Sequence, residues 1–322
     1  MPSIITHELF AQEALKAAPA NLKNTIQHYP KEFSIGSSGP DLFFYYNAWP
    51  WMDQKKGKVI SHLGSQIHSD YIQDFFAEVF IKTKMNPTPA KLSYLCGFLC
   101  HWALDKEAHP YIFNQTGDTS TKQGINDHRR FESHLDYLIL KELKGVSISK
   151  YPSHRLLKFN QETTHAIYDF YLSPLHKVFQ YDLSKSDIEK SLQHFEGIQK
   201  FLYDPHQVKT KLFYTIEKNI LHNPYAFSSM IVPEQADDLD ILNLSKRNWH
   251  HPCTNQVSNF SFPELFNNAL KTASNLLLVL DYYLHNQCTL KQLLQLINNQ
   301  SFETGLPTKE PMLHFDSIYK NK

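Results

Sequence analysis

The segment HWALDKEAHP, residues 101–110, holds the side chains of this chain best suited to chemistry. His101, Asp105 and His109 follow one another at intervals of four residues. On an α-helix, side chains with this spacing share one face. The segment follows an apolar stretch, LSYLCGFLC, which indicates that this face points toward the interior. Because charged side chains are rarely buried unless they are paired or bind a metal, the spacing predicts metal ligands.

A second pair of the same type follows about twenty residues later. His128 and Glu132 again stand four residues apart, in the segment NDHRRFESHLD. The alternative interpretation is an exposed i, i+4 pair of the kind found on many helices. Taken with the first segment, the pair predicts a metal site held between two helices.

Three more ligand candidates precede these segments. His7 lies in the first amphipathic segment, where an exposed helix histidine is the alternative. Asp41 follows Gly39 and Pro40 in a loop-like segment, and it could instead cap a turn. His68 competes with His62 for the same role. Catalytic zinc sites use these ligand types, His nitrogens with Asp or Glu oxygens, and leave one position open for water.

Cys96 and Cys100 precede His101 at C-x3-C-H spacing. This spacing is compatible with a metal site, but the surrounding Leu and Phe residues favour buried structural thiols. Other metal motifs are absent: there is no His-Asp dipeptide, no H-E-x-x-H, and one E-x-x-H, at residues 162–165.

Composition limits the classes of function. The 322 residues carry 32 basic and 32 acidic side chains, so the net charge of zero gives no specific nucleic-acid signal. The N-terminal sequence lacks the basic start and apolar run of a secretory signal, and no stretch of eighteen apolar residues occurs. We therefore expect a cytoplasmic protein without a transmembrane segment.

Helical periodicity dominates the chain and predicts an all-α fold. Segment 32–51 is predicted as a loop from its Pro and Gly content, and Ser261 with Glu264 as a capping box. We expect a single domain over 1–322, and a boundary near 146–152 is the alternative. Within the domain we expect a zinc-site core at 1–145, a helical remainder at 146–305 and a tail at 306–322. Helices are expected at about 6–18, 60–83, 90–109, 126–144, 155–172, 186–203, 206–223 and from 261 onward.

In this order, the motifs resemble the zinc-dependent phospholipase C family, whose helical bundle is shared with the S1/P1-type nucleases. The resemblance lies in T-H at 6–7, G-x-x-G-P-D at 36–41, the histidine at 68, H-x3-D-x3-H-P at 101–110 and H-x3-E at 128–132. Segment 261–273 also looks like a late helix of bacterial members. The resemblance is strongest over residues 1–140.

The resemblance implies ligand sets for the zinc ions. One ion would be held by Asp41, His68, His101 and Asp105. A second would take His109, His128 and Glu132. A third would use His7, Asp105 and the N-terminal amino group, and the N-terminal Trp of the secreted enzymes is absent here. Two zinc ions are therefore expected, and the third depends on the start of the chain.

The activity implied is hydrolysis of a small-molecule or lipid phosphodiester by a zinc-bound hydroxide, with Asp41 as general base. The substrate would allow a peripheral membrane contact. Phe44, Tyr45 and Trp49 are candidate substrate-binding residues, within an aromatic cluster that includes Phe43, Tyr46 and Trp51. This cluster would line the substrate mouth, cradle a cationic head group, or anchor the loop to the core. Two alternatives stay open: a nuclease or nucleotide phosphodiesterase of the same fold, and a zinc-binding protein that has lost catalysis.

Overall fold

The computed structural model describes residues 4–319, and these form a helical bundle. The α-helices are α1 (Ile4–Leu15), α2 (Ala20–His28), α3 (Pro30–Gly36), α4 (Gln54–Ser69), α5 (Ile72–Met85), α6 (Pro89–Thr116), α7 (Lys122–Lys144), α8 (Gln161–Phe179), α9 (Lys185–Leu202), α10 (Val208–Asn219), α11 (Phe262–Leu284) and α12 (Leu290–Ile297). Short 3-10 helices are η1 (Gly39–Tyr45), η2 (Ile148–Lys150), η3 (Ser153–Leu157) and η4 (Ser228–Met230). The prediction of an all-α fold is confirmed.

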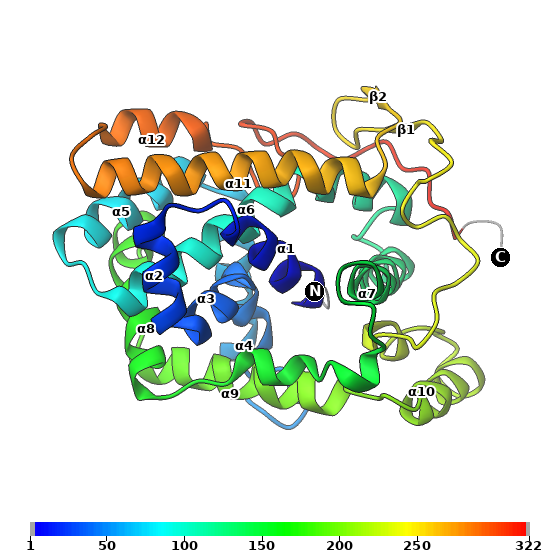
Figure 1. The fold of residues 1–322 in the computed structure, drawn as a ribbon. Coiled ribbons are helices and arrows are strands. Elements are labelled where there is room, and N and C mark those ends of the chain that lie inside the picture. The colour runs from blue at the N-terminus through cyan, green and yellow to red at the C-terminus, as the bar shows by residue number, and fades with distance from the viewer. Residues whose placement is uncertain (1–3, 320–322) are drawn as a thin grey trace.

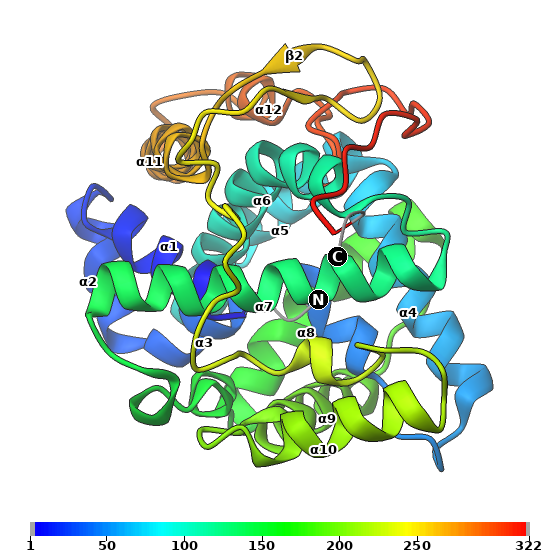
Figure 2. The same cartoon turned by 90° about the vertical axis from the view of Figure 1, so that its right-hand side faces the viewer.

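Helix α6 is the central element of the bundle. It packs against α1, α3, α7, α8 and α11, with α11 lying along one side of the molecule and α9 and α10 along the opposite side (Figure 1). The view turned by 90° shows α7 crossing the face on which α1 begins (Figure 2). A helix buried on nearly all sides can present polar side chains to a site that its neighbours complete, and α6 carries the H-x3-D-x3-H motif.

The only sheet among the described residues has two short strands. Strand β1 (Trp249–His250) pairs antiparallel with β2 (Val257–Ser258), and Trp249 lies opposite Ser258. Both strands lie in the segment that leads into α11. The predicted capping box of α11 is present, because the Ser261 side chain accepts from the backbone of Glu264 while the Glu264 side chain accepts from the Ser261 backbone.

Several element boundaries differ from the sequence prediction. Segment 32–51, predicted as a loop, contains most of α3 and the whole of η1, because Pro at the first positions of each is compatible with a helical turn. The helix expected over 60–83 is two helices, broken at Tyr71, whose φ of 53° is left-handed. Helix α6 continues past Pro110 to Thr116, since a proline removes one backbone hydrogen bond without ending every helix. Helices α2 and α12 were not predicted.

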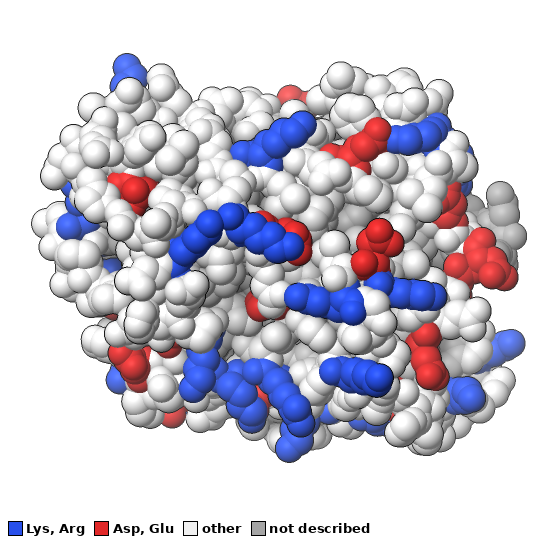
Figure 3. Space-filling view, in the orientation of Figure 1, with Lys and Arg blue, Asp and Glu red and all other residues white. Residues whose placement is uncertain are grey.

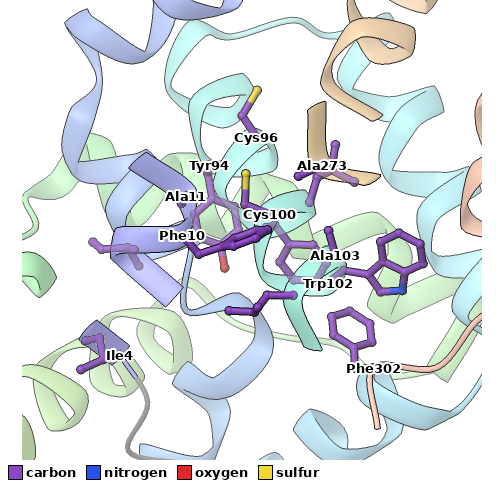
Figure 4. Close-up of a cluster of buried hydrophobic side chains, with 14 of the residues drawn as sticks. Ile4, Phe10, Ala11, Tyr94, Cys96, Cys100, Trp102, Ala103, Ala273 and Phe302 are labelled. Atoms are coloured by element: carbon purple, nitrogen blue, oxygen red, sulfur yellow. The ribbon is translucent and has the colours of Figure 1, made fainter. Parts of the chain in front are cut away.

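Cys96 and Cys100 lie on the core side of α6. Both are fully buried with free thiols, and burial raises the pKa of each thiol. Figure 4 shows them among apolar side chains that include Phe10 and Ala273. This is the structural role that their apolar flanks favoured, and neither belongs to a potential metal-binding cluster of the described residues.

The surface carries no block of one charge on the face shown in Figure 3, where basic and acidic side chains are interspersed. Over residues 4–319, no helix combines the length and the apolar character needed to cross a membrane.

Candidate metal centre

The three motif side chains of α6 form the middle of a buried polar cluster. His101, Asp105 and His109 have relative exposures of 0%, 2% and 3%. His101 Nε2 lies 2.9 Å from Asp105 Oδ2, and His109 Nε2 lies 3.6 Å from Asp105 Oδ1. The carboxylate of Asp105 therefore stands between two imidazoles of its own helix.

Three other elements bring side chains to this face. From α1, His7 Nε2 lies 3.2 Å from Asp105 Oδ1. From η1, Asp41 Oδ1 lies 3.2 Å from Nε2 of His68 on α4 and 4.0 Å from Nε2 of His101. His62, the rival of His68, is exposed and lies outside the cluster.

The histidine and glutamate of α7 lie at the other end of the cluster. On α7, His128 Nε2 lies 3.4 Å from Glu132 Oε1, and His109 Nε2 lies 3.7 Å from the same oxygen. Both α7 residues are buried, so the exposed i, i+4 pair of the alternative interpretation is not what the structure contains. Thr121 caps the start of α7 by accepting from Gly124, so the helix begins before His128.

A glycine allows the loop carboxylate to approach α6. Gly39 has a φ of +52°, and a Cβ at this position would lie 2.2 Å from His101 Cδ2. Any other residue would therefore meet the imidazole ring and would also strain the backbone. Gly39 places η1, and with it Asp41, directly against His101.

Backbone carbonyls fix the tautomer of three histidines. The Nδ1 atoms of His68, His101 and His109 lie 2.7, 3.0 and 3.0 Å from the carbonyl oxygens of Gly64, Ser37 and Phe302. A carbonyl can only accept, so Nδ1 is the N–H donor in each ring. The Nε2 lone pairs of the neutral rings are then directed at the carboxylates, which is the arrangement that orients metal-ligating histidines.

The donor atoms of the cluster fit a divalent cation such as zinc. They form three groups, in each of which the ligand atoms lie within 4.8 Å of one another: His7, His101 and Asp105; Asp41, His68 and His101; His109, His128 and Glu132. Ligands about 2.0–2.1 Å from a tetrahedral zinc ion stand about 3.3–3.4 Å apart. The separations of 2.9 to 4.0 Å in the cluster lie around this value.

Unsatisfied polar atoms point to the same conclusion. Several buried atoms of the cluster form no hydrogen bond of acceptable geometry with the described residues: His7 Nδ1, Asp41 Oδ1, His68 Nε2, His101 Nε2, Asp105 Oδ2 and Glu132 Oε2. Leaving such atoms without a partner is costly, and metal binding is a usual reason for such a group of atoms. Cations bound at the three groups would give partners to the Nε2 atoms and carboxylate oxygens among them.

The electrostatics keep the carboxylates in the ligating form. Burial would raise the pKa of Asp105 and Glu132, but the adjacent histidines hold both well below the usual range. Burial would lower the pKa of His109, but Asp105 and Glu132 raise it to about 10. A proton on His109 would thus balance these carboxylates, and a bound cation would displace it.

Two features of the site were not found from the sequence. The carbonyl of Phe302 orients His109, and the Phe302 ring lies 5.0 Å from that of His68, between ring centroids. A backbone carbonyl leaves no signal in a sequence. Asp136, on α7, accepts hydrogen bonds from the backbone of Ile5 and Thr6 and so holds the first turn of α1, which carries His7. The N-terminal amino group, which the family resemblance implied as a ligand of the third zinc ion, lies outside the described residues.

The aromatic cluster divides between core and pocket. Phe43 and Tyr46 are buried in the core, as the loop-anchoring alternative expects. The other aromatic residues, Phe44, Tyr45, Trp49 and Trp51, line a pocket.

The all-α bundle with buried histidine and carboxylate clusters on a central helix is matched by a known family. A sequence model of zinc-dependent phospholipase C matches residues 6–181, more than half of the chain. The chain therefore belongs to the zinc-dependent phospholipase C family, as its motifs indicated. The matched segment includes every histidine, aspartate and glutamate of the three clusters but not Phe302. No curated protein and no solved structure has significant similarity to the chain.

Proposed function

We propose that this protein is a zinc-dependent phosphodiesterase that binds its metal ions at the three clusters. The observation that carries the proposal is a set of buried, unsatisfied imidazole and carboxylate atoms spaced as zinc ligands, within a chain of the zinc-dependent phospholipase C family. Asp41, His68, His101 and Asp105 would hold one ion, and His109, His128 and Glu132 a second. His7 with Asp105 would contribute to a third.

Zinc, when bound, supplies positive charge to phosphate oxygens and lowers the pKa of a coordinated water toward neutrality. The side chains of the protein provide the remaining functions. Asp41 enters from η1 with one oxygen near His68, and its carboxylate would accept the proton of the attacking water. Asp105, in contact with imidazoles from α1 and α6, would fix the relative positions of the ligand sets.

Burial of the centre supports a role for water exclusion. Most of the ligand side chains are less than 8% exposed. Electrostatic interactions are stronger where solvent is excluded, so the fixed charges would act more strongly on a phosphodiester there than in water.

The test combines metal content with turnover. Protein purified without chelator should contain about two zinc ions per chain by elemental analysis, because seven ligands fill two sites without the chain start. The zinc-loaded protein should hydrolyse methyl p-nitrophenyl phosphate, and a chelator should abolish this activity. Protein that cannot be loaded with zinc would contradict the metal assignment. Full zinc loading without hydrolysis of any phosphodiester would favour the alternative of a binding protein that has lost catalysis.

A further inference from the structure

A polar pocket of about 260 Å³ lies against the face of α7 that is turned away from the metal centre. Arg130 and His134 line it, and each is two residues from the candidate ligand Glu132, which is about half a turn around the helix axis. The opposite wall comes from α10, from η4, which packs against both helices, and from the segments next to η4 (Figure 2). This wall lies outside residues 6–181, so the family match does not account for the pocket.

The arginine and the aspartate that line the pocket pair with each other. The Arg130 guanidinium donates to Asp237 Oδ2, and His134 Nε2 lies 3.5 Å from the same oxygen. The guanidinium also lies over the rings of Tyr225 and Tyr319, 4.1 and 4.8 Å from their centroids. A charged ligand would have to compete with this pairing, so the pocket favours an uncharged one.

A serine, a histidine and an aspartate line the pocket, but they do not form a nucleophilic triad. His134 Nδ1 lies 2.6 Å from the carbonyl oxygen of Arg130, and its Nε2 faces Asp237. A triad histidine needs one of its nitrogens for the nucleophile. Both nitrogens of His134 are engaged elsewhere, so Ser229 is placed to bind a ligand and not to attack one.

Two oxygen atoms of the lining are available to a ligand. Ser229 is 2% exposed, yet its Oγ forms no hydrogen bond with the residues that the structure describes. Asp237 uses Oδ2 for Arg130 and His134, and within residues 4–319 its Oδ1 accepts no hydrogen bond. A buried hydroxyl without a partner is costly, so a ligand that pairs with Ser229 gains from the contact. The group that faces the Asp237 carboxylate must donate.

Two tyrosines supply the apolar part of the lining. The rings of Tyr214 and Tyr225 are 4.9 Å apart between centroids and tilted by 45°. Aromatic rings with a few placed polar atoms are typical of small-molecule pockets. Because a hydroxyl both donates and accepts, neighbouring hydroxyls on one ring can satisfy Asp237 and Ser229 together, while the C–H face of that ring packs on a tyrosine.

We propose that this pocket binds an uncharged cyclic polyol about the size of one sugar ring, with Asp237 and Ser229 as its hydrogen-bond partners. The pocket shares no side chain with the three ligand clusters. The inference therefore does not rest on the proposed function, and it can be tested without measuring turnover.

The binding test compares rings that differ in charge and in hydroxyl groups. The purified protein is titrated by ligand-observed NMR with the methyl pyranosides of glucose, galactose and mannose. Glucuronate and glucosamine carry a similar ring with a negative or a positive charge, and each should bind at least about tenfold more weakly than the tightest neutral sugar. Cyclohexanol has a single hydroxyl and should also bind at least about tenfold more weakly. Inorganic phosphate, added to compete for the metal centre, should leave the affinity for the neutral sugar unchanged.

Variants locate the sugar in the pocket. Ser229→Ala should weaken its binding about fivefold, the loss of one hydrogen bond, and should leave the Tm unchanged because this hydroxyl has no partner in the described fold. The matched control is Ser191→Ala on α9, since Ser191 is also buried, its Oγ is likewise unpaired among residues 4–319, and it does not line the pocket. Asp237→Asn should weaken binding about tenfold or more, because hydrogen bonds to a charged acceptor are stronger.

The outcomes decide the inference in both directions. It would be overturned if none of the three neutral sugars binds, if glucuronate, glucosamine or cyclohexanol binds as tightly as they do, or if phosphate abolishes their binding. Equal effects of Ser229→Ala and Ser191→Ala would overturn it as well. Binding of a neutral sugar that resists phosphate and is weakened by Ser229→Ala but not by Ser191→Ala would uphold the pocket, whether or not the protein hydrolyses phosphodiesters.

Discussion

The most demanding prediction concerns the Asp105→Asn substitution. Asp105 is 2% exposed and its oxygens lie within 3.6 Å of the Nε2 atoms of His7, His101 and His109. An amide keeps the shape of the side chain but loses the charge and one ligating oxygen. Because the carboxylate contacts ligands of more than one cluster, we expect the substitution to weaken zinc binding throughout the centre.

The size of the effect follows from linkage between binding and folding. Zinc supplied at about 1,000 times its Kd stabilises the folded state by about 4.1 kcal/mol. If Asp105→Asn weakens binding by about 100-fold, the same zinc concentration is about 10 times the new Kd and contributes about 1.4 kcal/mol. The loss of about 2.7 kcal/mol corresponds to a fall in Tm of about 4 °C for a chain of this size.

The assay is thermal unfolding with zinc and with chelator. The prediction concerns the difference between the two Tm values, which removes effects of the substitution on the metal-free fold. Among residues 4–319, Glu132 forms ion pairs with His109 and His128 alone, so Glu132→Gln should lose less of this difference. Asp127→Asn is the matched control, since Asp127 is a buried carboxylate of α7 that accepts from Gln123 and, within residues 4–319, forms no ion pair with a histidine. A zinc-dependent rise in Tm as large in Asp105→Asn as in the wild type would refute a shared role for Asp105.

Further substitutions test the remaining assignments. Asp41→Asn should keep most of the zinc but reduce phosphodiester hydrolysis by about 10²–10⁴-fold, the range for a lost general base, and near wild-type turnover would rule out that role. Phe302→Ala should cost about 3–5 kcal/mol of stability in denaturant titrations and should lower zinc affinity, because the buried ring packs on His68 and anchors the backbone carbonyl that orients His109. An unchanged zinc affinity would mean that this contact does not position the ligands. His134 and Arg130 lower the pKa of Asp237 from 3.8 to about 2, so this pair stabilises the fold above about pH 4 and the contribution disappears as the pH falls through 2. The difference in Tm between wild type and Asp237→Asn, measured with chelator, should therefore shrink between pH 5 and pH 2, and a constant difference would contradict the shifted pKa.

Much of the site could be predicted from the sequence because its ligands follow helical spacing. Residues four apart share a face wherever a helix forms, so His101, Asp105 and His109 were placed together without knowledge of any neighbour. Helical periodicity likewise fixed the all-α class. The ligand set that the family resemblance implied is brought together in the structure, although metal binding by these residues stays a prediction.

Contacts between distant segments could be decided only by the tertiary structure. Local sequence does not decide whether His62 or His68 of α4 is the better ligand candidate. In the folded chain His62 is exposed, whereas His68 is buried against Asp41. The carbonyl of Phe302 reaches His109 across 193 residues, and a backbone oxygen has no residue type to reveal it. The aromatic pocket forms because α9 and α10 face the segment after η1, a juxtaposition set by the packing of whole helices. Local spacing therefore determined which side chains could bind a metal, and long-range packing determined what surrounds them.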